Sequence, residues 1–166
     1  MPEFILNRPA RRVHPFYALD DFAKGYVEAM FFTNGDTGDE REDLLNELGV
    51  ERLTRAAVKS IAADCAQFQK DAAPLLALAL APMSGYCEEQ AGRDFWLTRQ
   101  GHGAGFWDRE ELSVDVGKMP DGELLSGREA EEAGAELQGS LGDLLSAAAK
   151  AQGGVYPSVN RGWIYH

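Results

Sequence analysis

The chain has 166 residues, of which 45% are hydrophobic and 10% aromatic, so it can bury a core and is not expected to be disordered throughout. Its formal net charge of −11 would repel a phosphate backbone, which argues against direct nucleic-acid binding. No apolar run reaches the roughly 20 residues that span a bilayer and no signal peptide is evident, so a cytoplasmic protein away from membranes is expected.

The first half of the chain predicts mainly helices. Residues 1–18 contain three prolines and are expected to form an extended arm. Asp20 can cap a helix over residues 21–32, whose apolar side chains share one face. The run T-N-G-D-T-G from residue 33 predicts a loop, and a short acidic helix is expected over residues 40–48.

The middle of the chain predicts a strong helix and then a hairpin. Residues 53–68 carry apolar side chains at helical spacing, which indicates an amphipathic helix. Alanine-rich sequence over residues 71–81 predicts more helix, broken near Pro74. Residues 94–99 and 104–109 are rich in strand formers, and the Q-G-H-G between them is typical of a hairpin turn.

The last third predicts a loop, a helix and a second hairpin. Residues 110–128 are expected to be an acidic loop or insertion. A helix follows, marked by Leu137, Leu141, Leu144, Leu145 and Ala148. The tail after Gly154 can form a hairpin that turns near Asn160, Arg161 and Gly162. We therefore expect one α+β domain over residues 1–166, with three to four helices on a small antiparallel sheet built from hairpins.

The densest motif runs from residue 94 to residue 108, D-F-W-L-T-R-Q-G-H-G-A-G-F-W-D. Its aromatic side chains predict anchors that hold a sheet against the helices, namely Phe95, Trp96, Phe106 and Trp107. Its charged side chains predict ion pairs near the strand ends, from Asp94, Arg99 and Asp108. The motif is therefore interpreted first as structural.

This block resembles small, mostly uncharacterised proteins of bacteriophages and prophages that carry D-F-W-x-T-R-x-G-H-G-x-G-F-W-D. The match is close over residues 90–109 and looser over residues 25–29, 63–68 and 141–150. The resemblance implies a phage origin, and hence the cytoplasm of an infected bacterium, but no particular activity. The acidic stretch 110–136 is longer than the resemblance implies, so a function built on it would be particular to this protein.

Enzyme chemistry has one candidate centre, His102. A neighbouring carboxylate, Asp94 or Asp108, could orient its ring for general-base work beside Arg99. The other histidines, His14 and His166, fall in expected terminal arms, so we expect no metal site, no cofactor and no enzyme. His102 is predicted to be structural or a rim residue. A small enzyme or ligand-binding protein that uses the His102 turn remains an alternative.

The two cysteines suit a reduced, cytoplasmic protein. Cys65 and Cys87 are 22 positions apart and form no metal-ligand pattern, although a disulfide between them remains possible.

The negative charge is concentrated in two segments. Residues 36–51 carry −6 and residues 108–143 carry −8, while the rest of the chain carries +3. These segments hold all of the expected partner-binding residues, which are Asp36, Asp39, Glu40, Glu42, Asp43, Glu47, Glu51, Glu110, Glu111, Asp115, Asp121, Glu123, Glu129, Glu131, Glu132 and Glu136. Such dense carboxylates favour a protein that imitates DNA and blocks the DNA site of a host DNA-processing enzyme.

The target class stays open at this point. Gyrase or another topoisomerase (gyrase being only a guess), a nuclease, a restriction complex and a polymerase all have basic DNA channels that an acidic surface could enter. An accessory interaction protein without mimicry is an alternative, because acidic residues also serve solubility alone. A homodimer is compatible with either hypothesis.

Overall fold

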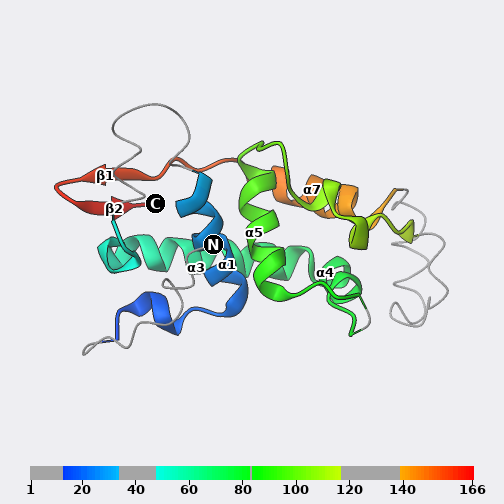
Figure 1. The fold of residues 1–166 in the computed structure, drawn as a ribbon, viewed down its shortest axis with the longest axis horizontal. Helices are drawn as coiled ribbons and strands as arrows, with labels where there is room; N and C mark the ends of the chain where they lie inside the picture. The colour runs from blue at the N-terminus through cyan, green and yellow to red at the C-terminus, as the bar shows by residue number, and fades with distance from the viewer. Residues whose placement is uncertain (1–12, 34–47, 83, 117–138) are drawn as a thin grey trace.

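The computed structural model describes residues 13–33, 48–82, 84–116 and 139–166 (Figure 1). The α-helices are α1 (Asp21–Thr33), α3 (Arg55–Asp71), α4 (Ala73–Ala79), α5 (Glu88–Arg99) and α7 (Leu141–Ala151). Short 3₁₀ turns are η2 (Pro15–Ala18), η3 (Val50–Arg52), η4 (Phe106–Asp108) and η5 (Glu110–Leu112). Strands β1 (Ser158–Asn160) and β2 (Trp163–Tyr165) form an antiparallel pair. Within these ranges, helices and a small sheet combine as an α+β fold expects, with more helices than the three to four predicted.

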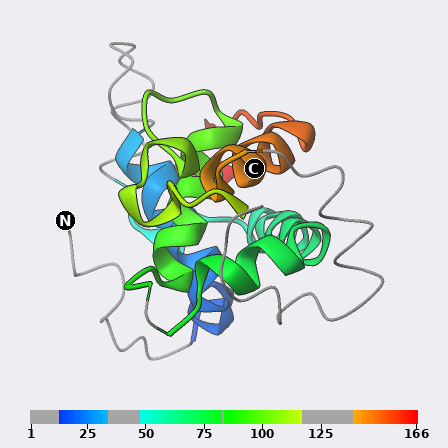
Figure 2. The same cartoon turned by 90° about the vertical axis from the view of Figure 1, so that its right-hand side faces the viewer.

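Helix α5 lies at the centre of the molecule, with α1 on one side and α7 on the other (Figure 1 and Figure 2). Two glycines let α1 and α5 approach closely. A Cβ at Gly25 would collide with the carbonyl oxygen of Glu89, and a Cβ at Gly92 with that of Phe22. Because both helices lack side-chain bulk at the crossing, their backbones touch there, and this contact fixes the position of α5.

Helix α3 confirms the amphipathic helix predicted from apolar spacing. Thr54 caps it by accepting a 3.0 Å hydrogen bond from the amide of Ala57. Its buried face ends at Phe68, whose ring stacks on Phe95 at a centroid distance of 4.2 Å and packs against Phe106 at 5.7 Å. Phe95 and Phe106 thus pack on this helix, but not as the sheet that the sequence predicted.

The first predicted hairpin is wrong, because residues 94–99 are the second half of α5 and Phe106–Asp108 is a 3₁₀ turn. The Q-G-H-G run is a helix end. Gly101 has φ +72°, its amide bonds to the carbonyl of Thr98, and the amide of His102 bonds to that of Leu97. These two bonds are the Schellman pattern that terminates helices. Burial of α5 on several sides overrides the strand preference of its aromatic residues.

Several other predictions about local structure are confirmed. Asp20 caps α1, since its Oδ1 accepts a 2.7 Å hydrogen bond from the amide of Ala23. The helical sequence breaks before Pro74, between α3 and α4. The tail forms a hairpin that turns at Arg161 and Gly162, both with positive φ.

The structure corrects two predictions, the extended terminal arm and the acidic loop, over those of their residues that it describes. Residues 15–18 form η2 with Phe16 buried in the core, so this part of the arm is not extended. The start of the loop forms η5, and α7 begins at Leu141, where Ser140 caps it by accepting from the amide of Asp143. Residues 34–47, with nearly all of the expected acidic helix, and residues 117–138 lie outside the described residues.

Candidate functional site

The fully buried carboxylate of Asp94, in the block at residues 94–108, accepts hydrogen bonds from several side chains. The guanidinium of Arg109 donates to both of its oxygens, with Nη2 at 2.6 Å from Oδ1 and Nε at 2.9 Å from Oδ2. The hydroxyl of Tyr86 donates at 2.6 Å and the amide of Gln90 at 3.1 Å. Burial, and then the charge of Asp94, raise the pKa of Tyr86, so that phenol stays a donor. The hydrogen bond with Asp94 likewise raises the pKa of Arg109, which remains charged.

The turn after α5 is closed by side-chain hydrogen bonds. The hydroxyl of Thr98 accepts from the amide of Phe106 at 3.1 Å, and Asp108 accepts from the amide of Gly105 at 2.9 Å. A Cβ at Gly105 would collide with the hydroxyl of Thr98. Trp107 is half exposed, unlike the three buried aromatic residues of the block, so its predicted role as an anchor is wrong.

Arg99 belongs to a second polar cluster, on the side of α5 that faces α3 and the C-terminal hairpin. Its Nη1 donates to Asp64 at 2.9 Å and to the hydroxyl of Tyr26 at 3.0 Å, and its Nε donates to the carbonyl of Gly153 at 2.8 Å. The expected ion pairs thus exist with other partners, since Asp94 pairs with Arg109 and Arg99 with Asp64.

The two terminal histidines are tied to the body, which corrects their assignment to arms. His14 Nε2 lies 3.1 Å from the carbonyl oxygen of Leu53. His166 Nε2 lies 2.9 Å from the Tyr26 hydroxyl, and its Nδ1 lies 3.2 Å from the Ser60 hydroxyl. Burial lowers the pKa of His166 to about 4, with Asp64 opposing the shift and Arg99 adding to it. The ring is therefore neutral in the folded protein at neutral pH.

A cavity of about 490 Å³ lies between α1, α5 and the turn that contains His102. The apolar part of its wall comprises Ala29, Phe32, Leu97, Gly103 and Ala104. The polar part comprises Glu28, Thr33, Gln90, Arg93, His102 and Arg109. His102 is partly buried at this wall, and its imidazole makes no hydrogen bond to another described residue. The cavity brings His102 together with residues of α1 and α5 that no local sequence pattern groups with it.

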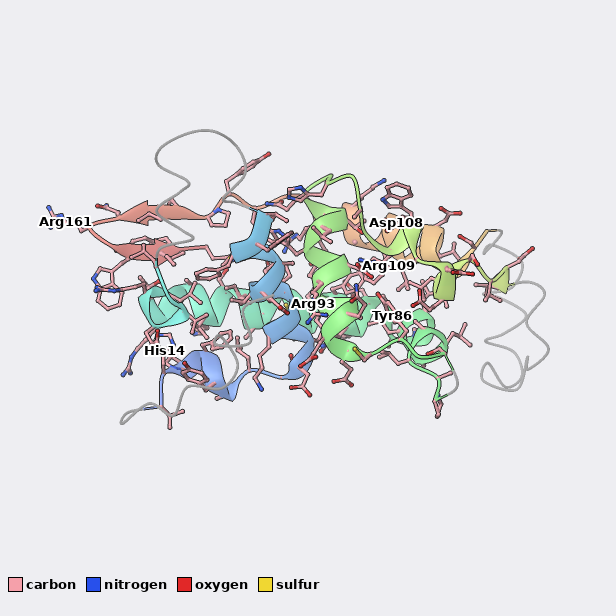
Figure 3. All side chains as sticks on the ribbon, in the orientation of Figure 1. His14, Tyr86, Arg93, Asp108, Arg109 and Arg161 are labelled. Carbon is pink, nitrogen blue, oxygen red and sulfur yellow. The ribbon has the colours of Figure 1, made fainter. Side chains whose placement is uncertain are left out.

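The two arginine side chains of the cavity are held in place by hydrogen bonds and ion pairs with neighbouring polar side chains. Arg93 binds the buried Glu28, with Nη2 and Nε at 2.6 and 2.7 Å from Oε2, and its Nη1 donates to Gln90 at 3.3 Å. Gln90 in turn donates to Asp94, which holds Arg109. Figure 3 shows Tyr86, Arg93 and Arg109 gathered around α5. Only Arg93 of these three lies on α5, since Tyr86 precedes the helix and Arg109 follows it, so no local sequence pattern groups them.

The expected partner-binding acids fall only partly within the described residues. Glu110 and Glu111 are exposed on η5. Asp115 forms a bridge with Ser140, and Glu51 accepts from the hydroxyl of Tyr17 at 3.2 Å. The remaining expected residues lie outside, namely Asp36, Asp39, Glu40, Glu42, Asp43, Glu47, Asp121, Glu123, Glu129, Glu131, Glu132 and Glu136. The start of α3, next to Glu51, and η5 lie at opposite ends of the long axis (Figure 1).

Comparisons with known proteins give no guide to function, because no family model, curated protein or solved structure matches the chain. The described residues contain no group of three or more His, Cys, Asp or Glu side chains that could hold a metal ion. No helix among them is long and apolar enough to cross a membrane. Cys65 and Cys87 are both free thiols, so the disulfide considered from the sequence is absent.

Proposed function

We propose that the protein is an inhibitor, of phage origin, whose acidic segments bind the DNA site of a host DNA-processing enzyme. The supporting observation is the segregation of charge. Residues 34–47 hold six acids and one base, and residues 117–138 hold six acids and two bases. In the chain, the first segment lies between α1 and η3, and the second lies between η5 and α7.

Two separated acidic regions suit an extended basic channel better than a compact pocket. DNA presents one negative charge per roughly 1.7 Å of its axis, so a mimic must spread carboxylates along its length. The exposed Glu110 and Glu111 on η5 continue the negative charge of the second segment onto the body. Basic channels attract such a surface over long range, which speeds association.

The test is competition with duplex DNA. The protein is immobilised, a bacterial lysate is passed over it at low salt, and a captured protein is purified. Duplex DNA should displace the protein from that target, and raising salt from about 0.05 to about 0.5 M should weaken binding because the Debye length falls from about 14 to about 4 Å. Simultaneous binding of DNA and the protein to the target would refute mimicry.

Charge-reversal variants locate the contact. Lys at the exposed Glu110 and Glu111 should slow association severalfold and leave unfolding unchanged, because exposed charges contribute little to stability. Lys at Glu40, Asp43 and Glu47 should likewise slow association severalfold. A matched control puts Lys at the exposed Asp71 and Glu88, which lie outside both acidic segments. If the control slows association as much as the first double variant does, net charge rather than a specific acidic surface governs binding.

A further inference from the structure

The cavity beside His102 has features that the acidic segments do not explain. It measures about 490 Å³, within the range of roughly 300–1,000 Å³ typical of small-molecule sites. Two guanidinium groups, one imidazole and an aromatic ring line it. We propose that it binds a small organic anion in which a phosphate or carboxylate group is joined to a planar ring.

The guanidinium groups supply the anion-binding part of the cavity. The acid behind Arg93, Glu28, is 7% exposed, and the acid behind Arg109, Asp94, is 0% exposed. Each acid holds its arginine in place. Asp94 does not line the cavity, and Glu28, which does, is paired with Arg93 through Oε2. Nη1 of Arg109 makes no hydrogen bond within the described part of the chain, and the same is true of the His102 ring. These donors are free to bind an oxyanion, and a guanidinium fixed beforehand loses little entropy when it does so.

The ring of Phe32 supplies the apolar part of the cavity, against which the planar ring of the ligand would lie. It is 73% exposed and lines the cavity, so core packing does not account for it. Leu97 and Ala29 extend the apolar wall beside it. A planar ring stacked on Phe32 would cover this apolar surface, and stacking on an exposed aromatic side chain is a strong contribution to binding. Charge at one part of the wall and an aromatic face at another define the ligand as an aromatic anion.

The probes separate the two halves of the ligand. Adenosine monophosphate represents ring phosphates and indole-3-acetate represents ring carboxylates. Adenosine lacks the anion and inorganic phosphate lacks the ring. Calorimetry should show binding of at least one of the two ring anions. A ring anion that binds should exceed its own half-ligands, adenosine and phosphate or indole and acetate, by about tenfold or more. Amide chemical shifts should move at Gly103 and Ala104, which line the cavity.

Two variants test the site without removing an arginine that pairs with a buried acid. Ala104→Leu fills the cavity from a partly buried position and should abolish binding. Phe32→Ala should weaken it about tenfold, by loss of stacking. Tyr156→Ala is the matched control, because Tyr156 is 91% exposed and does not line the cavity. Circular dichroism checks that each variant is folded.

The outcomes are separable from those of the acidic-segment proposal. Failure of both ring anions to bind, or unchanged binding in Ala104→Leu, would overturn the assignment. Equal binding of adenosine and adenosine monophosphate, with no binding of indole-3-acetate, would also overturn it, because the arginines would then play no part. Ala104→Leu should capture the target protein as well as the wild type does, since it leaves the acidic segments unaltered.

Discussion

Replacing Arg109 with Gln tests whether the buried carboxylate of Asp94 governs stability. The substitution leaves Asp94, which has no exposed surface, with only the neutral donors Tyr86 and Gln90. Removing one partner of a buried ion pair costs about 3–5 kcal/mol. The side chain of Arg109 is 29% exposed, so water already weakens the pair and a loss of about 3 kcal/mol is expected. That is a large share of the roughly 5–15 kcal/mol that stabilises a typical domain.

Urea unfolding followed by circular dichroism measures this loss, provided that the denaturant dependence stays the same. Tyr86→Phe removes one hydrogen bond to the same charge and should cost about 1.5–3 kcal/mol. Lys24→Gln is the control, since its 3.4 Å ion pair with Asp21 lies at the surface and should matter by less than about 0.5 kcal/mol. If Arg109→Gln costs no more than the control, Asp94 does not depend on its partner and the reasoning is wrong.

Three further predictions follow from packing, protonation and exposure. Gly92→Ala should lower the free energy of unfolding, measured in thermal melts, by about 3 kcal/mol or more, because the added Cβ meets the α1 backbone. Gly103→Ala should lower it little, because there is open space around the added Cβ. The pKa of His166 falls from 6.5 to about 4 on folding, so between these pH values the unfolded chain binds more protons than the folded chain. The free energy of unfolding of the wild type should therefore decrease from pH 6.5 to pH 4, by up to about 3 kcal/mol relative to His166→Gln. Urea midpoints of the two proteins that change equally with pH would contradict this. Cys87 should react with a thiol reagent in the folded protein, and buried Cys65, whose pKa burial raises, only after unfolding.

The sequence predicted those elements whose signals are local. The helix around Ile61 repeats its apolar side chains at helical spacing, and Asp20 is a strong capping residue for α1. The tail turn contains Gly162, a residue type that adopts positive φ without a steric cost. Each of these patterns is complete within a few residues, so no knowledge of the rest of the chain was needed.

Helix α5 could not be predicted in the same way, because its neighbours decide its structure. Phe95 and Trp96 are adjacent and both fully buried, which a helix permits only when several elements surround it. From the sequence alone, this adjacent pair of strand formers next to a glycine-rich run is typical of a hairpin. The residues that mark the helix crossing are Gly25, which lies against Glu89, and Gly92, which lies against Phe22, and these contacts are visible only once both helices are placed.

The candidate site was missed for the same reason. Gln90, Arg93 and Leu97 line one face of α5 at helical spacing, and Glu28 and Phe32 do so on α1. Treating the first group as the approach to a strand separated it from His102. The acid beneath Arg109 lies 15 residues earlier in the chain, a pairing that no local pattern indicates.

The block at residues 94–108 therefore divides into residues that the fold requires and residues that it does not. The first group is buried and partnered, and it comprises Asp94, Phe95, Trp96, Thr98, Arg99 and Phe106. The ring of His102 lies at the cavity without a hydrogen bond to another described residue, and Trp107 is half exposed. Such side chains gain little from folding and are open to contact with a molecule outside the chain. The cavity wall at His102 is where a small ligand would make that contact.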